Sequence, residues 1–201
     1  MKKHILIITI LFFSKNYAQN ILANKNQKKW FSTVELGFSI PNETKYNSSL
    51  LDVNGNYLEG LSLKLSNKAT YGALYTLNYP ILRRLSLGVI GGYSYHIQPE
   101  ISNVKLGGII RYHFVDANLA NFYLLSTYRF SLNENFKNGG LGGNIRLGIS
   151  FSILEEASYS LILNGFWNYS SHETKKPLIL SNEGPGFIFI KGYGISLGIQ
   201  F

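Results

Sequence analysis

KGYGISLGIQF, residues 191–201, is the stretch of sequence that decides the fold. Large apolar side chains alternate in it with small or polar ones, which predicts a β-strand with two different faces. A strand that has one apolar face and ends on an aromatic residue is typical of a transmembrane β-barrel, because aromatic side chains gather at the membrane–water boundary. The apolar positions are Tyr193, Ile195, Leu197, Ile199 and Phe201.

The N-terminal residues predict a secretory signal peptide. Lys2 and Lys3 precede an apolar run from Ile5 to Phe13, and the small residue Ala18 offers a cleavage site. The run is too short to span a bilayer, which disfavours the alternative of a retained anchor helix. We expect residues 1–18 to be removed, residues 19–29 to form a periplasmic segment, and residues 30–201 to form a barrel.

Composition excludes several classes of protein. The sequence has 19 basic and 11 acidic residues. Lys2, Lys3 and Lys15 leave with the signal peptide, so 16 basic and 11 acidic residues give the mature chain a charge of +5. The basic residues are scattered, which argues against a nucleic-acid partner and fits mild attraction to anionic lipid. The chain has no cysteine, so a disulfide framework is excluded.

Eight segments of the chain alternate between apolar and small or polar residues. Beyond residue 18, no segment reaches the roughly 20 apolar residues of a membrane helix, so the chain can enter a bilayer only as a closed barrel. We predict an all-β fold, an eight-stranded antiparallel up-and-down transmembrane β-barrel. A soluble β-sandwich also alternates, but it would leave the terminal aromatic residue unexplained. The predicted strands span 31–40, 69–79, 85–97, 103–114, 121–131, 141–153, 158–170 and 187–201.

The longest predicted loop, residues 41–68, has a hairpin signal of its own. It contains Asn54-Gly55, a pair typical of a two-residue type I′ turn. Leucines at alternate positions follow this pair, so the first two strands are expected to continue outside the membrane as a hairpin with its tip at Asn54 and Gly55. Pro41 interrupts the first strand, which leaves an irregular loop as an equal alternative.

Charged side chains within the predicted strands face the barrel interior. On the lipid face, arginine at mid-bilayer would cost about 2–4 kcal/mol. Lys191 is the exception, and it falls near the edge of the apolar band, where lysine can reach the interface. The inward residues suit either a structural ion-pair network or a gate in a narrow anion-preferring pore. These lumen candidates are Glu35, Lys105, Arg111, Arg129 and Arg146.

Signals for catalysis or metal binding are weak. Ser94, His96 and Glu100 lie close in sequence at the predicted outer rim and suggest a lipid hydrolase, although strand alternation alone puts Ser94 and His96 on one face. His96, His113 and His172 are predicted to lie apart, with His172 in the last loop, so no metal site is expected. We predict no catalytic residue, no metal and no cofactor.

With its signal peptide ending at Ala18, its eight alternating segments and its terminal Phe201, the chain resembles the small outer-membrane β-barrel family common in Bacteroidetes-type bacteria. It is more distantly similar to the OmpA-type and OmpX-type barrels, and the resemblance covers roughly residues 30–201. Members of such families are mostly described as porin-like, structural or adhesive. The resemblance implies an integral place in the outer membrane, contact with lipid and lipopolysaccharide, and recognition of the Phe201 strand by the barrel-assembly machinery.

The expected function is therefore that of a non-enzymatic surface barrel, whose extracellular loop 41–68 contacts an unknown surface ligand. The alternative is a narrow porin-like channel with a weak anion preference, which would arise from the basic residues of the lumen. A hydrolase acting on lipid at the rim is the third hypothesis.

Overall fold

The computed structural model describes residues 29–114, 119–137 and 143–201. The predicted signal peptide and nearly all of the predicted periplasmic segment lie outside the described residues. Among the described residues, no helix is long and apolar enough to cross a membrane. Nine strands occur in this part of the chain: β1 (Phe31–Leu51), β2 (Tyr57–Lys64), β3 (Thr70–Leu82), β4 (Leu85–His96), β5 (Ile101–His113), β6 (Ala120–Ser131), β7 (Gly143–Glu155), β8 (Ser160–Glu173) and β9 (Phe187–Gln200).

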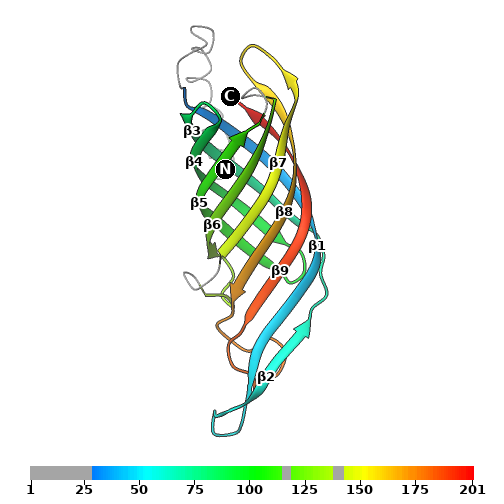
Figure 1. The fold of residues 1–201 in the computed structure, drawn as a ribbon. Coiled ribbons are helices and arrows are strands. Elements are labelled where there is room, and N and C mark those ends of the chain that lie inside the picture. The colour runs from blue at the N-terminus through cyan, green and yellow to red at the C-terminus, as the bar shows by residue number, and fades with distance from the viewer. Residues whose placement is uncertain (1–28, 115–118, 138–142) are drawn as a thin grey trace, which may run out of the picture.

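Eight of the strands in the described part, β1 and β3–β9, form a closed antiparallel barrel (Figure 1). Each strand pairs with its neighbour along the chain, and β1 also pairs with β9 from Thr33↔Gln200 to Asn47↔Phe187. This last pairing closes the sheet on itself, so the barrel wall has no free edge. The predicted all-β, eight-stranded up-and-down barrel is confirmed.

Alternation along the strands sorts the side chains onto two faces. Polar side chains such as Thr33, Asn78 and Asn164 are fully buried inside the barrel. Large apolar side chains are exposed outside, on every barrel strand. Such an apolar outer face is unfavourable in water and meets acyl chains in a bilayer. Representatives from the eight strands are Leu36, Tyr75, Val89, Leu106, Leu124, Leu147, Leu163 and Leu197.

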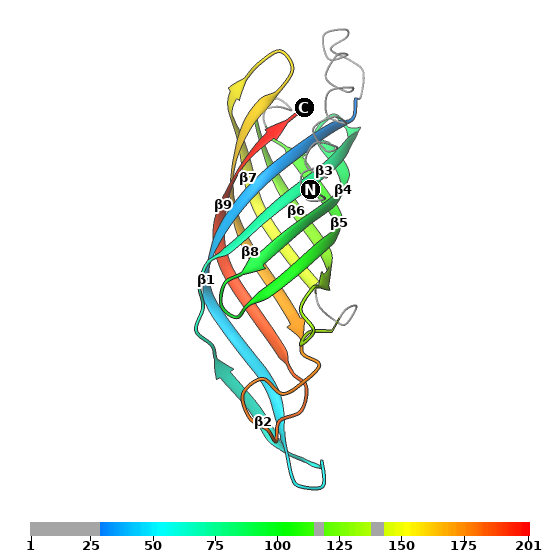
Figure 2. The same ribbon diagram turned by 180° about the vertical axis from the view of Figure 1, so that it is seen from behind.

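β1 is much longer than the predicted first strand and continues beyond the barrel wall (Figure 2). It passes through Pro41, and its register with β9 shifts between Pro41 and Glu43. A bulge suits proline, because proline has no N–H to donate to the ladder. Beyond the bulge, β1 pairs with β2 from Lys45↔Lys64 to Leu51↔Tyr57. Of the two alternatives for loop 41–68, the structure therefore has the hairpin.

The turn of this hairpin spans Asp52–Asn56. The Gly55 N–H donates to the Asp52 carbonyl at 3.0 Å, and Gly55 has φ of 82°, a left-handed conformation that glycine adopts without strain. The Asp52 carboxylate accepts the backbone N–H groups of Asn54 and Asn56, both at 2.8 Å. Hydrogen bonds from Asn56 hold the pKa of Asp52 below its usual range. Because Asp52 stabilises this longer loop, the predicted two-residue type I′ turn is not formed.

β8 also extends further than predicted. It reaches Glu173, so His172 lies in a barrel strand and not in the last loop. Its register with β9 continues through His172↔Ile188, which keeps His172 on the inward face. This correction brings an additional imidazole into the lumen.

Candidate functional site in the barrel lumen

The lumen is the space enclosed by β1 and β3–β9, and it contains the candidate functional residues. Its inner end is the end at which β1 begins and β9 finishes, and its outer end carries the β1–β2 hairpin. Side chains fill the lumen, as expected for a barrel of eight strands. They form three layers: an ion pair toward the inner end, an apolar belt at mid-height, and a basic group toward the outer end.

The inner layer is built around Arg111 and Glu35, which form an ion pair at 3.4 Å. Arg111 also donates to the side-chain oxygens of Asn78 and Asn121, each at 3.4 Å. The second carboxylate oxygen of Glu35 accepts the Ser196 hydroxyl at 3.1 Å. Both charged groups are almost completely buried, so these partners are needed to offset the loss of water.

An apolar belt crosses the lumen at mid-height. Its members come from five strands and pack as one buried cluster: Leu74, Ile90, Ile109, Tyr123, Leu125 and Phe166. Cations lie against its rings, with the Arg146 guanidinium 3.8 Å from the Phe166 ring centroid and that of Arg111 5.3 Å from the Tyr123 centroid. Such contacts are favourable because a ring face is electron-rich.

The outer layer brings together basic groups that were predicted from the sequence to lie apart. The rings of His96 and His172 lie edge to face with centroids 5.4 Å apart. His172 is hydrogen-bonded to Arg129, which also donates to the Gly143 carbonyl at 2.8 Å. The prediction that His96 and His172 do not converge is wrong, because it relied on His172 being in a loop.

The third histidine, His113, does lie apart from the other two. It contacts Ser86 at 3.2 Å near the inner end of the barrel. In the described part of the chain, no group of three or more histidine, aspartate or glutamate side chains is arranged to hold a metal ion.

Lys105 completes the outer layer. It is buried, as are Arg129 and Arg146. Among the described residues, no carboxylate lies within ion-pair distance of any of these three side chains. Glu35 therefore pairs with Arg111 alone, and the predicted network does not extend to Arg129, Arg146 or Lys105.

A second apolar cluster covers the outer mouth of the lumen. Tyr46 of β1 packs there with side chains of β5, β9 and the segment that follows β6, and the sequence did not predict this cluster. The apolar residues Ile188 and Ile190, at alternate positions before Gly192, were its visible signal. The members are Tyr46, Ile101, Phe136, Ile188 and Ile190, with Leu65 and Leu178 against them.

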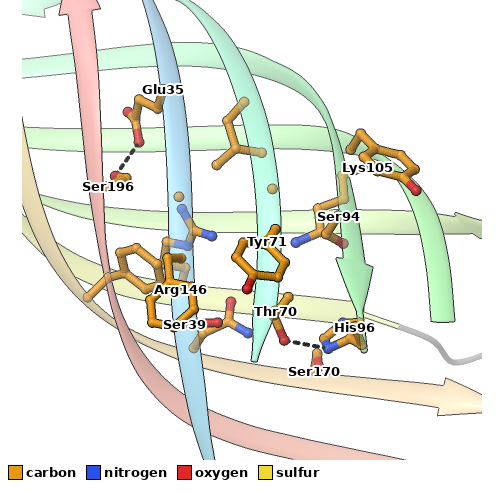
Figure 3. A pocket seen from close by; sticks show the side chains of 17 residues that line it. Glu35, Ser39, Thr70, Tyr71, Ser94, His96, Lys105, Arg146, Ser170 and Ser196 are labelled. Atoms are coloured by element: carbon orange, nitrogen blue, oxygen red, sulfur yellow. Dashed lines mark hydrogen bonds between the residues drawn. The ribbon is translucent and has the colours of Figure 1, made fainter. Parts of the chain in front are cut away.

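The space left in the lumen is small. A cavity between the belt and the outer layer holds about 20 Å³ for the centres of water-sized molecules, which is room for about one water (Figure 3). Glu35, Ser94, His96, Lys105 and Arg146 line it. Side chains therefore leave little space in this part of the lumen.

The geometry does not form the imagined hydrolase at the rim. His96 Nδ1 is hydrogen-bonded to the Thr70 hydroxyl at 2.7 Å, and Glu100 accepts the Tyr95 hydroxyl at 3.3 Å. Ser94 Oγ has no hydrogen-bond partner among the described residues. Because His96 and Glu100 bond elsewhere, no relay links these groups to Ser94.

The other predicted residues lie outside the lumen. Asn54 and Gly55 are exposed in the hairpin turn. Tyr193, Ile195, Leu197 and Ile199 are exposed on the apolar face of β9. The backbone of Phe201 exchanges two hydrogen bonds with Ser32, at 2.9 and 3.2 Å.

The fold is shared with outer-membrane proteins of known structure. Outer membrane protein AlkL, solved by solid-state NMR in DMPC lipid bilayers, aligns with a TM-score of 0.53 and 12% identity over 89% of this chain and 92% of AlkL. Outer membrane protein OprG from Pseudomonas aeruginosa aligns with a TM-score of 0.51 and 12% identity over 86% of this chain and 95% of OprG. No family model and no curated protein sequence matches the chain.

The closed strand order, the apolar outer face and this likeness define the class. The protein has the fold of an integral outer-membrane β-barrel. It is similar in fold to AlkL and OprG.

Proposed function

We propose that this protein is a narrow, gated channel of the outer membrane that favours small anions. The charge of its lumen carries the proposal: in the described part, the barrel strands bury four basic side chains, from lysine and arginine, and one carboxylate, that of Glu35. Clusters of arginine and lysine stabilise an anion in a pore and repel a cation. The fold that the chain shares with outer-membrane barrels supports this location for the channel.

The gate of this channel is the apolar belt. A constriction lined by Leu125 and Phe166 excludes water, and an ion does not cross it until side chains move. The cluster over the outer mouth forms a second barrier in series. Opening therefore requires rotation of belt side chains or displacement of the segments that cover the mouth.

Single-channel recording of the refolded protein in a planar bilayer tests this function. We expect small, discrete conductance steps and a reversal potential that shows anion preference in a potassium chloride gradient. Phe166→Ala should increase the conductance or the open time, because it thins the belt. Phe151→Ala is the matched control, since Phe151 is exposed on the lipid face of β7. A barrel that folds but stays silent in both variants would sink the channel function.

A second candidate function rests on β2. In the described part of the chain β2 is an edge strand, paired only with β1. Its residues are largely exposed, including Tyr57 and Leu58. An edge strand presents free N–H and C=O groups and can accept an extended segment of another protein. We propose that a surface ligand adds a strand at this edge.

Site-specific crosslinking in cells tests the second candidate. A photo-reactive residue at Leu58 should give a protein adduct, and the same residue at the lipid-facing Leu147 should not. Replacing residues 49–60 by an Asn-Gly turn should remove the half of β2 that carries Tyr57 and Leu58 while the barrel still folds, because Ser48 and Leu61 are paired across the hairpin. Equal adducts at both positions would count against a specific edge partner.

Two further partners follow from the resemblance and the exposed faces. We propose that the exposed apolar outer face of the barrel contacts outer-membrane lipid and lipopolysaccharide, and that the assembly machinery recognises the exposed face of β9 that ends at Phe201. Phe201→Ser should then lower the yield of folded barrel in cells more than the yield of refolding in detergent. Equal losses in the two settings would indicate a purely structural role.

A further inference from the structure

We propose that the lumen binds a halide-sized anion between Lys105 and Arg146, on the outer side of the apolar belt. The site deepens the channel function proposed above and rests on it for the route by which the ion arrives. The site is specific in its ligand, its side chains and its position, whereas a general anion preference is not.

Lys105 and Arg146 have unbalanced charge. Lys105 and Arg146 are 5% and 7% exposed, and both line the same cavity. Among the described residues, neither of the two forms an ion pair with a carboxylate. A buried cation without a counter-charge is costly, so an anion between them would be strongly favoured.

Unsatisfied donors line the same cavity. Ser94 is 2% exposed, and its hydroxyl has no hydrogen-bond partner among the described residues; the Nε of Arg146 also has none. Figure 3 shows Ser94, Lys105 and Arg146 around this cavity. Buried polar atoms are nearly always paired in folded proteins, so these two donors are available to a bound acceptor.

The neighbouring groups leave these donors free for a ligand. Arg129 is occupied by His172 and the Gly143 carbonyl. Glu35 also lines the cavity and would repel an anion, but Arg111 and Ser196 hold its two oxygens. The Phe166 ring 3.8 Å from the Arg146 guanidinium restricts its orientation, so the site is partly preorganised.

The size of the cavity selects the anion. About 20 Å³ for the centres of water-sized molecules admits one water or one monatomic ion. Chloride is therefore the expected ligand, and bromide is a suitable probe for it.

Bromide binding to the refolded full barrel tests the site by two measurements. Crystals soaked in sodium bromide should show an anomalous peak between Lys105 and Arg146. In detergent at constant ionic strength, replacing gluconate by bromide should raise the unfolding temperature by about 3 °C, because a ligand of the folded state stabilises it. Lys105→Met should abolish both the peak and the shift. Lys191→Met is the matched control and should keep both, since Lys191 pairs with Glu43 on the outside.

Ser94→Ala keeps the test decisive if Lys105→Met fails to fold. It should weaken bromide binding roughly fivefold, the effect of losing one hydrogen bond. No peak in the wild-type lumen, or an unchanged shift in Ser94→Ala and Lys105→Met, would overturn the site. A barrel that conducts anions without this peak overturns the site and keeps the channel. A silent barrel that shows the peak overturns the channel and keeps the site.

Discussion

The Phe166 ring occupies the space over Gly194, its cross-strand neighbour on β9, because Gly194 has no side chain. A Cβ at position 194 would lie 2.5 Å from the Phe166 ring and 2.5 Å from the Phe38 carbonyl oxygen. The ring cannot simply rotate away, since it packs in the apolar belt, and the carbonyl belongs to the β1–β9 ladder. Single glycines thus decide how much aromatic volume this narrow barrel encloses.

Gly194→Ala should destabilise the folded barrel by about 1–3 kcal/mol, the usual cost of overpacking a filled interior. Gly165→Ala is the matched control, because a Cβ at position 165 meets nothing within 4 Å. Unfolding by urea in detergent micelles measures both variants. Equal stability of the two variants would mean that the belt can repack around a methyl group.

Glu35 and Arg111 depend on each other because both are buried. Glu35→Gln leaves the Arg111 cation without its counter-charge and should cost about 3–5 kcal/mol. Adding Arg111→Met removes the stranded cation, so the double variant should be more stable than Glu35→Gln alone. Unfolding free energies of the two single variants and the double variant give the coupling directly. Strictly additive losses would show that the pair is not coupled.

At the scale of elements, the segment 174–186 between β8 and β9 folds back onto β1. Its Glu183 accepts the Tyr46 hydroxyl at 2.9 Å and the Ile179 N–H at 2.8 Å, and the Gly184 N–H donates to the Ser49 carbonyl at 2.8 Å. Burial alone would raise the pKa of Glu183, but the hydrogen bonds from Ile179, Leu178 and Tyr46 outweigh it and hold the pKa below its usual value of 4.5. A buried carboxylate therefore fastens this segment over the mouth.

Acid should loosen the segment. Because the pKa of Glu183 is lowered on folding, its contribution is fully present above pH 4.5 and is lost as the pH falls through the lower folded value. The protection of amides in residues 174–186, relative to their intrinsic exchange rate at each pH, should fall over that range while the barrel strands stay protected. Glu183→Gln should already exchange fast at pH 7, and Glu59→Gln on exposed β2 should behave as wild type. Protection factors that do not change with pH in the wild type would contradict this role.

On the scale of the whole molecule, exposed leucines have different surroundings depending on their height. Leu147 lies on the apolar outer face of the barrel, whereas Leu58 lies on the hairpin beyond the barrel. Both are about half exposed, at 49% and 59%. Only the bilayer distinguishes the two sites, since water surrounds an exposed side chain outside the membrane.

Leu147→Arg should therefore cost about 2–4 kcal/mol in lipid vesicles, the penalty for arginine near mid-bilayer. Leu58→Arg should change stability by less than about 0.5 kcal/mol, as surface substitutions do. Unfolding in vesicles measures both variants. Equal tolerance of the two arginines would contradict the placement of the apolar outer face in the bilayer.

Local periodicity explains why the barrel could be predicted. Leu197 and Leu147 alternate with small or polar neighbours, and this alternation determines which face each side chain takes. The inward position of Lys105, Arg111, Arg129 and Arg146 followed from the same alternation. The extent of β1 did not, because pairing with β2 and β9 carries the strand past Pro41.

The sequence by itself determined the class of this protein: strand number, inward and outward faces, and a basic lumen. These properties depend on residues two apart in one strand, so they are visible in the chain. Tertiary structure alone decided that Glu35 pairs with Arg111, that His172 meets His96, and that Tyr46 and Phe136 close the mouth. Those contacts join residues from distant strands, and tilt and register of the closed barrel bring them together, which no local pattern encodes.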